Sequence, residues 1–157
     1  MKSATLSEVK KELATLPPAK VFELCMRVAK YKKENKELLN YLLFEAHDED
    51  AYIKNIKAEI DFQYALMNRS TLYLAKKSTR KILRTANKFI KYSGNKKTEV
   101  ELRIYFCEKM KKSGILQHES VTMMNLYTGQ LKRINSALAT LHEDLQYDYK
   151  NIVEKLS

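Results

Sequence analysis

Glycine and proline are scarce in this chain, and their scarcity limits what it can fold into. Only 3 glycines and 2 prolines occur among 157 residues, whereas turn-dense all-β domains and linker-rich chains use many of both. No segment alternates apolar and polar residues for long enough to require a strand, and apolar residues recur instead every three or four positions. The sequence therefore predicts an all-α fold.

Capping and helix-breaking residues divide the chain into expected helices. Thr5 with Glu8 resembles a capping box, and the Pro17-Pro18 pair ends the first helix and begins the second. Further boundaries are expected at Asp48, at Ser70 or Thr71, at Gly94 and at Gly114. With one domain as the default at this length, we expect a single all-helical domain over residues 1–157, built from antiparallel helical hairpins or a bundle.

A faint internal similarity bears on how these hairpins are arranged. Residues 31–44 resemble residues 92–106, because in both a helix ends in a Lys-Tyr pair, a short turn rich in lysine and asparagine follows, and the next helix carries leucine or isoleucine and then phenylalanine. The similarity favours stacked, HEAT-like hairpins over a simple up-and-down bundle. Two copies are fewer than the three that a solenoid usually needs.

An apolar row predicts a long C-terminal helix. Apolar residues from Met124 onward step by alternating three and four, which is the spacing of a helical seam. The central members of the row are Leu131, Ile134, Leu138, Leu141 and Leu145. One helix from about Ser120 would be about 54 Å long, which exceeds the diameter of about 40 Å expected for a compact chain of this size. A bend or break near 142–144 is the favoured interpretation over an unbroken helix. An elongated molecule and a seam that pairs with a second copy are the other possibilities.

The net charge of +10 is concentrated in one segment. Between Asp61 and Glu99 the chain has no acidic residue and ten lysines and arginines, while the rest of the chain is balanced. A smaller acidic cluster lies just upstream, in residues 45–61. Such asymmetry points to long-range attraction of an anionic partner rather than to a particular fold.

The helix expected over about 71–92 separates its cations from its apolar side chains at 100° per residue. The candidate contacts for an anionic partner are Arg69, Lys77, Arg80, Lys81, Arg84, Lys88 and Lys91. Six of them lie along about 21 Å of helix, a spacing that suits a phosphate backbone. Nucleic acid bound without sequence specificity is the first candidate, and an acidic protein surface is the second. Pairing with residues 45–61 and simple solvation of a polar face are the alternatives.

Motifs for catalysis or metal binding are not found in the sequence. His47, His118 and His142 are dispersed, so no pair has the spacing of a helical metal site. Cys25 and Cys107 lie on apolar helix faces, where a cysteine usually acts as a small hydrophobe. We therefore expect a non-enzymatic binding module with no metal and no cofactor. A structural protein that forms a homodimer through the C-terminal seam is the alternative function.

The cellular compartment is inferred from cysteine usage and hydropathy. The two cysteines are 82 positions apart, which does not resemble a disulfide framework and favours a reducing cytoplasm. No apolar run approaches the roughly 20 residues that a membrane span requires, so no membrane partner is expected.

Two parts of the chain resemble small all-helical bacterial domains of unknown function. The resemblance is carried by Val9–Leu13, Leu16–Pro18, Val21–Cys25, Lys97–Leu102 and Tyr105–Cys107. It implies an all-α fold and carries no activity, cofactor or site residue.

Overall fold

The computed structural model describes residues 2–157, and over that range it contains eight α-helices and no strand, which confirms the all-α prediction. The chain divides into two compact units, Met1–Phe44 and Glu45–Ser157, and each is a separate set of packed helices. The expectation of one domain over residues 1–157 stays a prediction.

The first unit consists of three helices, of which only the first has a side-chain N-cap. They are α1 (Leu6–Thr15), α2 (Pro18–Tyr31) and α3 (Lys33–Asn40), followed by a π-helical turn, η1 (Tyr41–Glu45). The amide of Glu8 donates to Thr5 Oγ1 at 3.3 Å and the amide of Thr5 donates to Glu8 Oε2 at 2.7 Å, which is a complete capping box. Pro18 is the first residue of α2. Both predicted boundaries are confirmed.

The first unit has very little core of its own. Of residues 2–44, only Ala29 and Tyr41 are buried. Many of its large apolar side chains are exposed, including Leu6, Val9, Leu13, Phe22, Val28, Leu42, Leu43 and Phe44. Because apolar burial supplies most of the stability of packed helices, this unit has little of that stabilisation.

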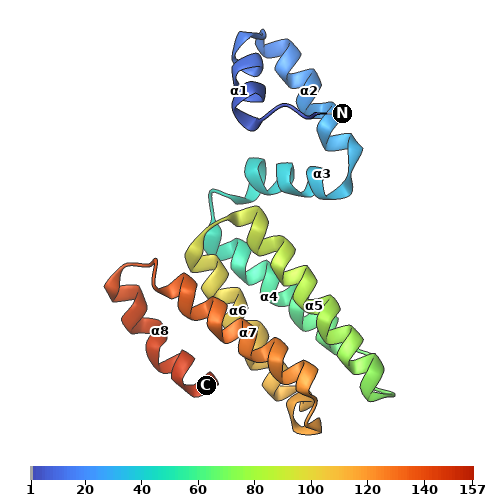
Figure 1. Cartoon of the computed structure of the whole chain (residues 1–157), viewed down its shortest axis with the longest axis vertical. Coiled ribbons are helices and arrows are strands. Elements are labelled where there is room, and N and C mark those ends of the chain that lie inside the picture. The colour runs from blue at the N-terminus through green and yellow to red at the C-terminus, as the bar shows by residue number, and fades with distance from the viewer. Residues whose placement is uncertain (1) are drawn as a thin grey trace. The chain divides into compact units, whose positions relative to one another are not determined.

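The second unit is a bundle around one central helix. Its elements are α4 (Glu49–Ala65), α5 (Leu72–Ser93), α6 (Lys96–Lys112), a 3₁₀ turn η2 (Ile115–His118), α7 (Val121–Leu138) and α8 (Glu143–Leu156). Helix α6 contacts α4, α5, α7 and α8, and Figure 1 shows α4, α5, α6 and α7 running alongside one another.

The composition of α6 explains its central position. Eight residues of α6 are buried, and at 100° per residue they cover about two thirds of the helix circumference rather than one narrow stripe: Thr98, Val100, Leu102, Arg103, Ile104, Phe106, Cys107 and Met110. A helix that is apolar on several sides is stable only when other helices cover those sides. The helix begins at Lys96 after the N-cap Asn95, whose side chain accepts hydrogen bonds from the amides of Lys97 and Thr98.

The faint internal similarity is not reflected in the packing of its two copies. Phe106 is fully buried, whereas the corresponding Phe44 is 65% exposed. The stacked HEAT-like arrangement therefore gains no support from these positions, and the second unit is the bundle form of the predicted architecture.

The C-terminal segment breaks into two helices. Helix α7 ends at Leu138 and α8 begins at Glu143, so the favoured prediction of a break is confirmed a few residues before the expected place, and the unbroken helix is wrong. His142 caps α8, because its Nδ1 accepts a hydrogen bond from the amide of Asp144 at 3.3 Å.

The predicted apolar row is used inside the second unit. Ile134 and Leu138 are buried, and Leu131, Leu141 and Leu145 are half-buried. These five residues are divided between α7, the connection and α8, so they do not form one exposed seam.

The buried row of α7 also differs from the predicted row near the start of the helix. Met123, Tyr127, Gln130, Ile134 and Ala137 are buried. The predicted first member, Met124, is 47% exposed. Met123 therefore takes the core position.

The burial of Leu138 predicts the effect of placing a charge there. Leu138→Glu should lower the free energy of unfolding by about 3 kcal/mol or more, because an unpaired carboxylate would replace a buried apolar side chain. Val121→Glu, on the same helix at a position 73% exposed, should change it by less than about 0.5 kcal/mol. Urea denaturation followed by circular dichroism measures both. Equal stability of the two variants would show that Leu138 is not part of the core.

Candidate anion-binding surface

Helix α5 carries the candidate surface, and its two ends are well capped. Thr71 Oγ1 accepts a hydrogen bond from the amide of Leu74 at 3.2 Å. Gly94 ends the helix with a φ of 66° and donates its amide hydrogen to the carbonyl of Ile90 at 3.0 Å, a left-handed conformation that glycine adopts without strain. The caps predicted at Thr71 and Gly94 are confirmed.

Packing fixes which side of α5 faces outward. Thr79, Ile82, Ala86 and Ile90 are buried, and α5 contacts α4 and α6. The opposite side is the α5 cationic face, which consists of Lys77, Arg80, Lys81, Arg84, Lys88 and Lys91. At 100° per residue these six positions lie within a sector of about 100°.

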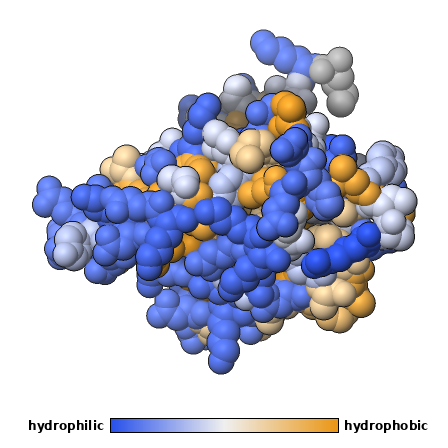
Figure 2. Space-filling model, turned by 90° about the horizontal axis from the view of Figure 1, so that it is seen from below, coloured by the Kyte–Doolittle hydropathy of each residue, from blue (hydrophilic) through white to orange (hydrophobic). Residues whose placement is uncertain are grey.

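Most of the α5 cationic face is open. Lys77, Arg80, Lys81, Arg84 and Lys91 are exposed, and none of these five forms an ion pair with any of residues 2–157. Lys88 differs from them: it is half-buried, and its Nζ lies 4.9 Å from the centroid of the Phe89 ring. Figure 2 shows one face of the molecule, where hydrophilic side chains predominate and hydrophobic ones lie between them in separate groups.

Arg69 lies apart from this face. It belongs to the connection between α4 and α5 and is exposed. It borders a small hollow of about 160 Å³ that His118 also lines. The structure therefore places six of the seven predicted contact residues on one helix side and the seventh beyond the N-terminal end of that helix.

Acidic residues at the start of α4 pair with residues around the beginning of α6. Glu49 accepts hydrogen bonds from Ser93 Oγ at 2.9 Å and from the hydroxyl of Thr98. Asp50 forms an ion pair with Lys97 at 3.3 Å. Asp50 is therefore engaged with α6, and Glu49 bonds to the last residue of α5 and to the first turn of α6.

Asp61, near the other end of α4, is engaged in the same way. It forms an ion pair with Lys109 at 2.6 Å and accepts a hydrogen bond from the Tyr105 hydroxyl at 2.7 Å, both on α6. Burial alone would raise the pKa of this carboxyl, but the bonds from Lys109 and Tyr105 outweigh it and lower the pKa. Asp50 and Asp61 thus form their ion pairs with lysines of α6 rather than with the five exposed cations of α5.

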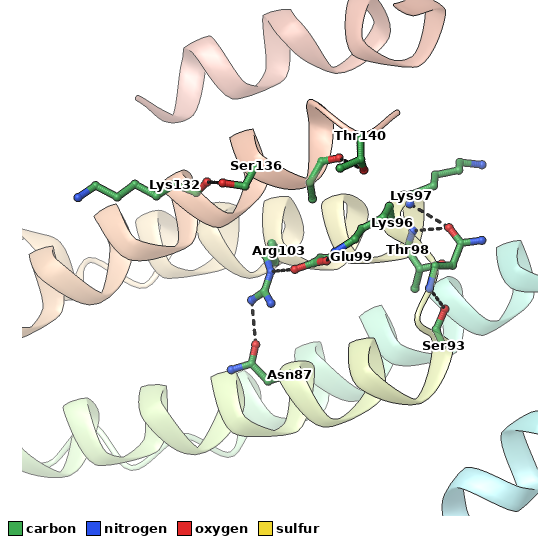
Figure 3. A network of polar contacts seen from close by, with 12 residues as sticks. Asn87, Ser93, Lys96, Lys97, Thr98, Glu99, Arg103, Lys132, Ser136 and Thr140 are labelled. Atoms are coloured by element: carbon green, nitrogen blue, oxygen red, sulfur yellow. Dashed lines mark hydrogen bonds and ion pairs between the residues drawn. The ribbon is translucent and has the colours of Figure 1, made fainter. Parts of the chain in front are cut away.

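A buried arginine connects three helices beside this face. Arg103 is 4% exposed; its Nε donates to Glu99 at 2.9 Å, and its Nη1 donates to Asn87 and to Gln130 at 2.8 Å each. These acceptors lie on α6, α5 and α7, and Figure 3 shows Arg103 reaching from α6 to Asn87. Glu99 also pairs with Lys96 at 3.0 Å.

The electrostatics of Glu99 follow from this network. Burial would raise its pKa, but the bonds from Lys96 and Arg103 outweigh burial and lower the pKa. The carboxylate is therefore ionised at neutral pH, which keeps the guanidinium of Arg103 paired inside the bundle. Arg103 is not among the predicted site residues, although its spacing of four residues from Glu99 is a signal of a helical ion pair.

Glu101 provides a second carboxylate that holds helices together. It accepts a hydrogen bond from Lys57 Nζ of α4 at 2.8 Å and another from the Tyr149 hydroxyl of α8. Burial would raise its pKa, but the bonds from Lys57 and Tyr149 lower it below the usual value of 4.5. Its side chain is 25% exposed.

The described residues offer no second kind of site chemistry. No three side chains of His, Cys, Asp or Glu in residues 2–157 come together as a metal site requires. Cys107 is fully buried, and burial raises the pKa of its thiol to about 12, so it is protonated at neutral pH. Within the same residues, no helix combines the length and the hydrophobicity needed to cross a membrane.

Comparison of the chain with protein-family models, with curated proteins and with solved structures gave no significant match. The interpretation of the α5 cationic face therefore rests on its own geometry and charge. The resemblance of two segments to small helical bacterial domains stays a prediction.

The lowered pKa of Glu101 predicts how stability depends on pH. Because the folded protein binds this proton less readily than the unfolded chain, the contribution of Glu101 is present above pH 4.5 and is lost as the pH falls through its folded value. Glu101→Gln should lower the free energy of unfolding by about 1–2 kcal/mol at pH 7, and the difference from the wild type should shrink toward pH 3. Urea titrations between pH 7 and pH 3 measure it. The exposed substitution Glu154→Gln should follow the wild-type curve, and a constant gap for Glu101→Gln at every pH would contradict the assignment.

Proposed function

We propose that this protein is a non-enzymatic module that binds nucleic acid without sequence specificity through the α5 cationic face. The observation that carries the proposal is that five exposed lysines and arginines of one helix side have no ion-pair partner in residues 2–157. Uncompensated cations in a row raise the local concentration of an anionic polymer and are stabilised when its phosphates replace small counterions.

The dimensions of the face support a phosphate backbone as the ligand. Lys77 and Lys91 are separated by about 21 Å along the helix axis. A nucleic-acid strand carries one phosphate per about 3.4 Å of duplex axis, so about six phosphates fit in this length. The face therefore presents about one cation per phosphate.

The chemistry of the face supports binding that ignores base sequence. Its side chains are lysines and arginines, which bind phosphate oxygens. Asparagine can read adenine through its side-chain amide, but the Oδ1 of Asn87 accepts a hydrogen bond from Arg103. Tyr92, at the end of the helix, is half-buried and packs edge-on against Phe89, with ring centroids 6.0 Å apart. Tyr73, at the other end, is 68% exposed and can supply stacking on a base, which is also independent of sequence.

The experiment compares two double variants with the same change in formal charge. Arg80→Glu with Arg84→Glu alters the centre of the face. Lys54→Glu with Lys150→Glu alters exposed positions on α4 and α8. Fluorescence anisotropy with a labelled 20-base-pair duplex at 50 mM salt measures affinity. The first variant should bind at least about 30-fold more weakly than the wild type and the second within about threefold.

The salt dependence provides an independent check. With about five phosphates engaged, the slope of log K against log salt should be near −4 for the wild type. Arg80→Gln with Arg84→Gln should reduce its magnitude by about two. Equal weakening by the two charge-reversal variants would refute a localised face. Retention on an acidic protein matrix without any duplex binding would favour an acidic protein surface as the partner.

A further inference from the structure

A polar hollow lies at the C-terminal end of the α5 cationic face. It has a volume of about 460 Å³ and is bordered by the end of α5, the beginning of α6 and the middle of α7. Its lining includes four cations from these three helices: Lys91, Lys96, Arg103 and Arg133. Lys91 is also the last member of the α5 cationic face, so the face and the hollow are continuous.

The hollow is positively charged after its internal pairing is taken into account. Glu99 is its only carboxylate, and it pairs with Lys96 and Arg103. Lys91 and Arg133 are exposed and form no ion pair with residues 2–157. Against one negative charge, the four cations leave a formal excess of three positive charges in one concave site.

Arg103 gives this site a fixed donor. Its Nε and Nη1 are held by Glu99, Asn87 and Gln130, so the guanidinium cannot move to follow a ligand. Its third nitrogen, Nη2, donates to none of residues 2–157, and the side chain lines the hollow. A guanidinium that is preorganised in this way binds an oxyanion with little loss of side-chain entropy.

The remaining lining selects for a phosphate group rather than for a base. Ile90 is the single large apolar residue, and no aromatic side chain borders the hollow, so a base would find no ring to stack on. Asn87 and Asn95 complete the polar lining. A small, strongly charged oxyanion satisfies these groups better than any planar apolar ligand.

We propose that this hollow binds the terminal phosphate monoester of a nucleic-acid strand that lies along the α5 cationic face. The inference rests on the proposed function, because Lys91 joins the two surfaces. A terminal monoester carries a charge of about −1.5 to −2 at pH 7, whereas an internal diester carries −1, and the excess positive charge of the hollow favours the former. An internal phosphate is bonded to a nucleotide on each side, so it suits the open helix face. A terminal phosphate is bonded on one side only, so it can enter a concave site.

The test uses three 12-nucleotide single strands of one sequence, with a 5′-phosphate, a 3′-phosphate, or hydroxyl groups at both ends. Anisotropy at 50 mM salt gives the ratio of dissociation constants between hydroxyl-ended and phosphate-ended strands. For the wild type, one phosphate-ended strand should bind at least about fivefold more tightly than the hydroxyl-ended strand. Arg133→Gln should bring this ratio to about one.

A matched variant separates the hollow from the face. Arg84→Gln removes one exposed arginine from the face, so it should weaken all three strands by similar factors and preserve the ratio. Arg133 and Arg84 are both exposed, and thermal melting should show that neither variant unfolds. A free phosphate ion and a strand end share the same chemistry. Titration with inorganic phosphate therefore tests whether the hollow binds a free phosphate ion as well.

The possible outcomes are distinct. A wild-type ratio above about five that Arg133→Gln abolishes and Arg84→Gln preserves supports the inference. Binding of all three strands with a ratio of one overturns the inference and leaves the proposed function standing. Failure of every strand to bind overturns the strand-end site, and the duplex measurement then decides the proposed function separately. If inorganic phosphate then still binds to the wild type and not to Arg133→Gln, the hollow is a site for a free phosphate ion.

Discussion

The pairing of α4 carboxylates with α6 is the interaction on which the rest of the second unit depends. Helix α6 is covered on several sides, so its polar groups must find partners within the bundle. Glu49 supplies one of them, to the buried Thr98, and Asp61 supplies another, to the half-buried Lys109. Asp61, the acidic residue nearest to α5 in the sequence, is thus bonded to α6. This carboxylate is therefore not available to the exposed cations of α5.

The buried cation Arg103 lies beside exposed cations in the hollow. Arg103 meets acceptors on three helices, and these acceptors come together in one relative register of α5, α6 and α7. A buried charged network adds little net stability compared with apolar packing, but it restricts how neighbouring helices can slide past one another. Arg103 therefore forms a rigid wall of the hollow, whereas Lys91, which has no ion pair with residues 2–157, can adjust to a ligand.

Local features were predictable from the sequence, and features that depend on distant residues were not. The caps Thr5, Thr71 and Gly94 were identified because each acts on backbone groups within four residues. The partners of Arg103 on α5 and α7 lie 16 and 27 residues away, so no local pattern indicates them. The apolar row of α7 was misjudged by one position because both Met123 and Met124 are apolar, and only the packing against α6 decides between them.

The thin core of the first unit has a consequence for the exchange of backbone amide hydrogens with solvent deuterium. An amide in α6 can exchange only when the bundle around it opens. The opening free energy calculated from its protection factor therefore approaches the global free energy of unfolding. Between residues 2 and 44, where Ala29 and Tyr41 alone are buried, one helical turn can open at the expense of few apolar contacts. Deuterium uptake should therefore divide the chain into a fast-exchanging N-terminal portion and a slowly exchanging remainder, with the boundary close to the π-helical turn.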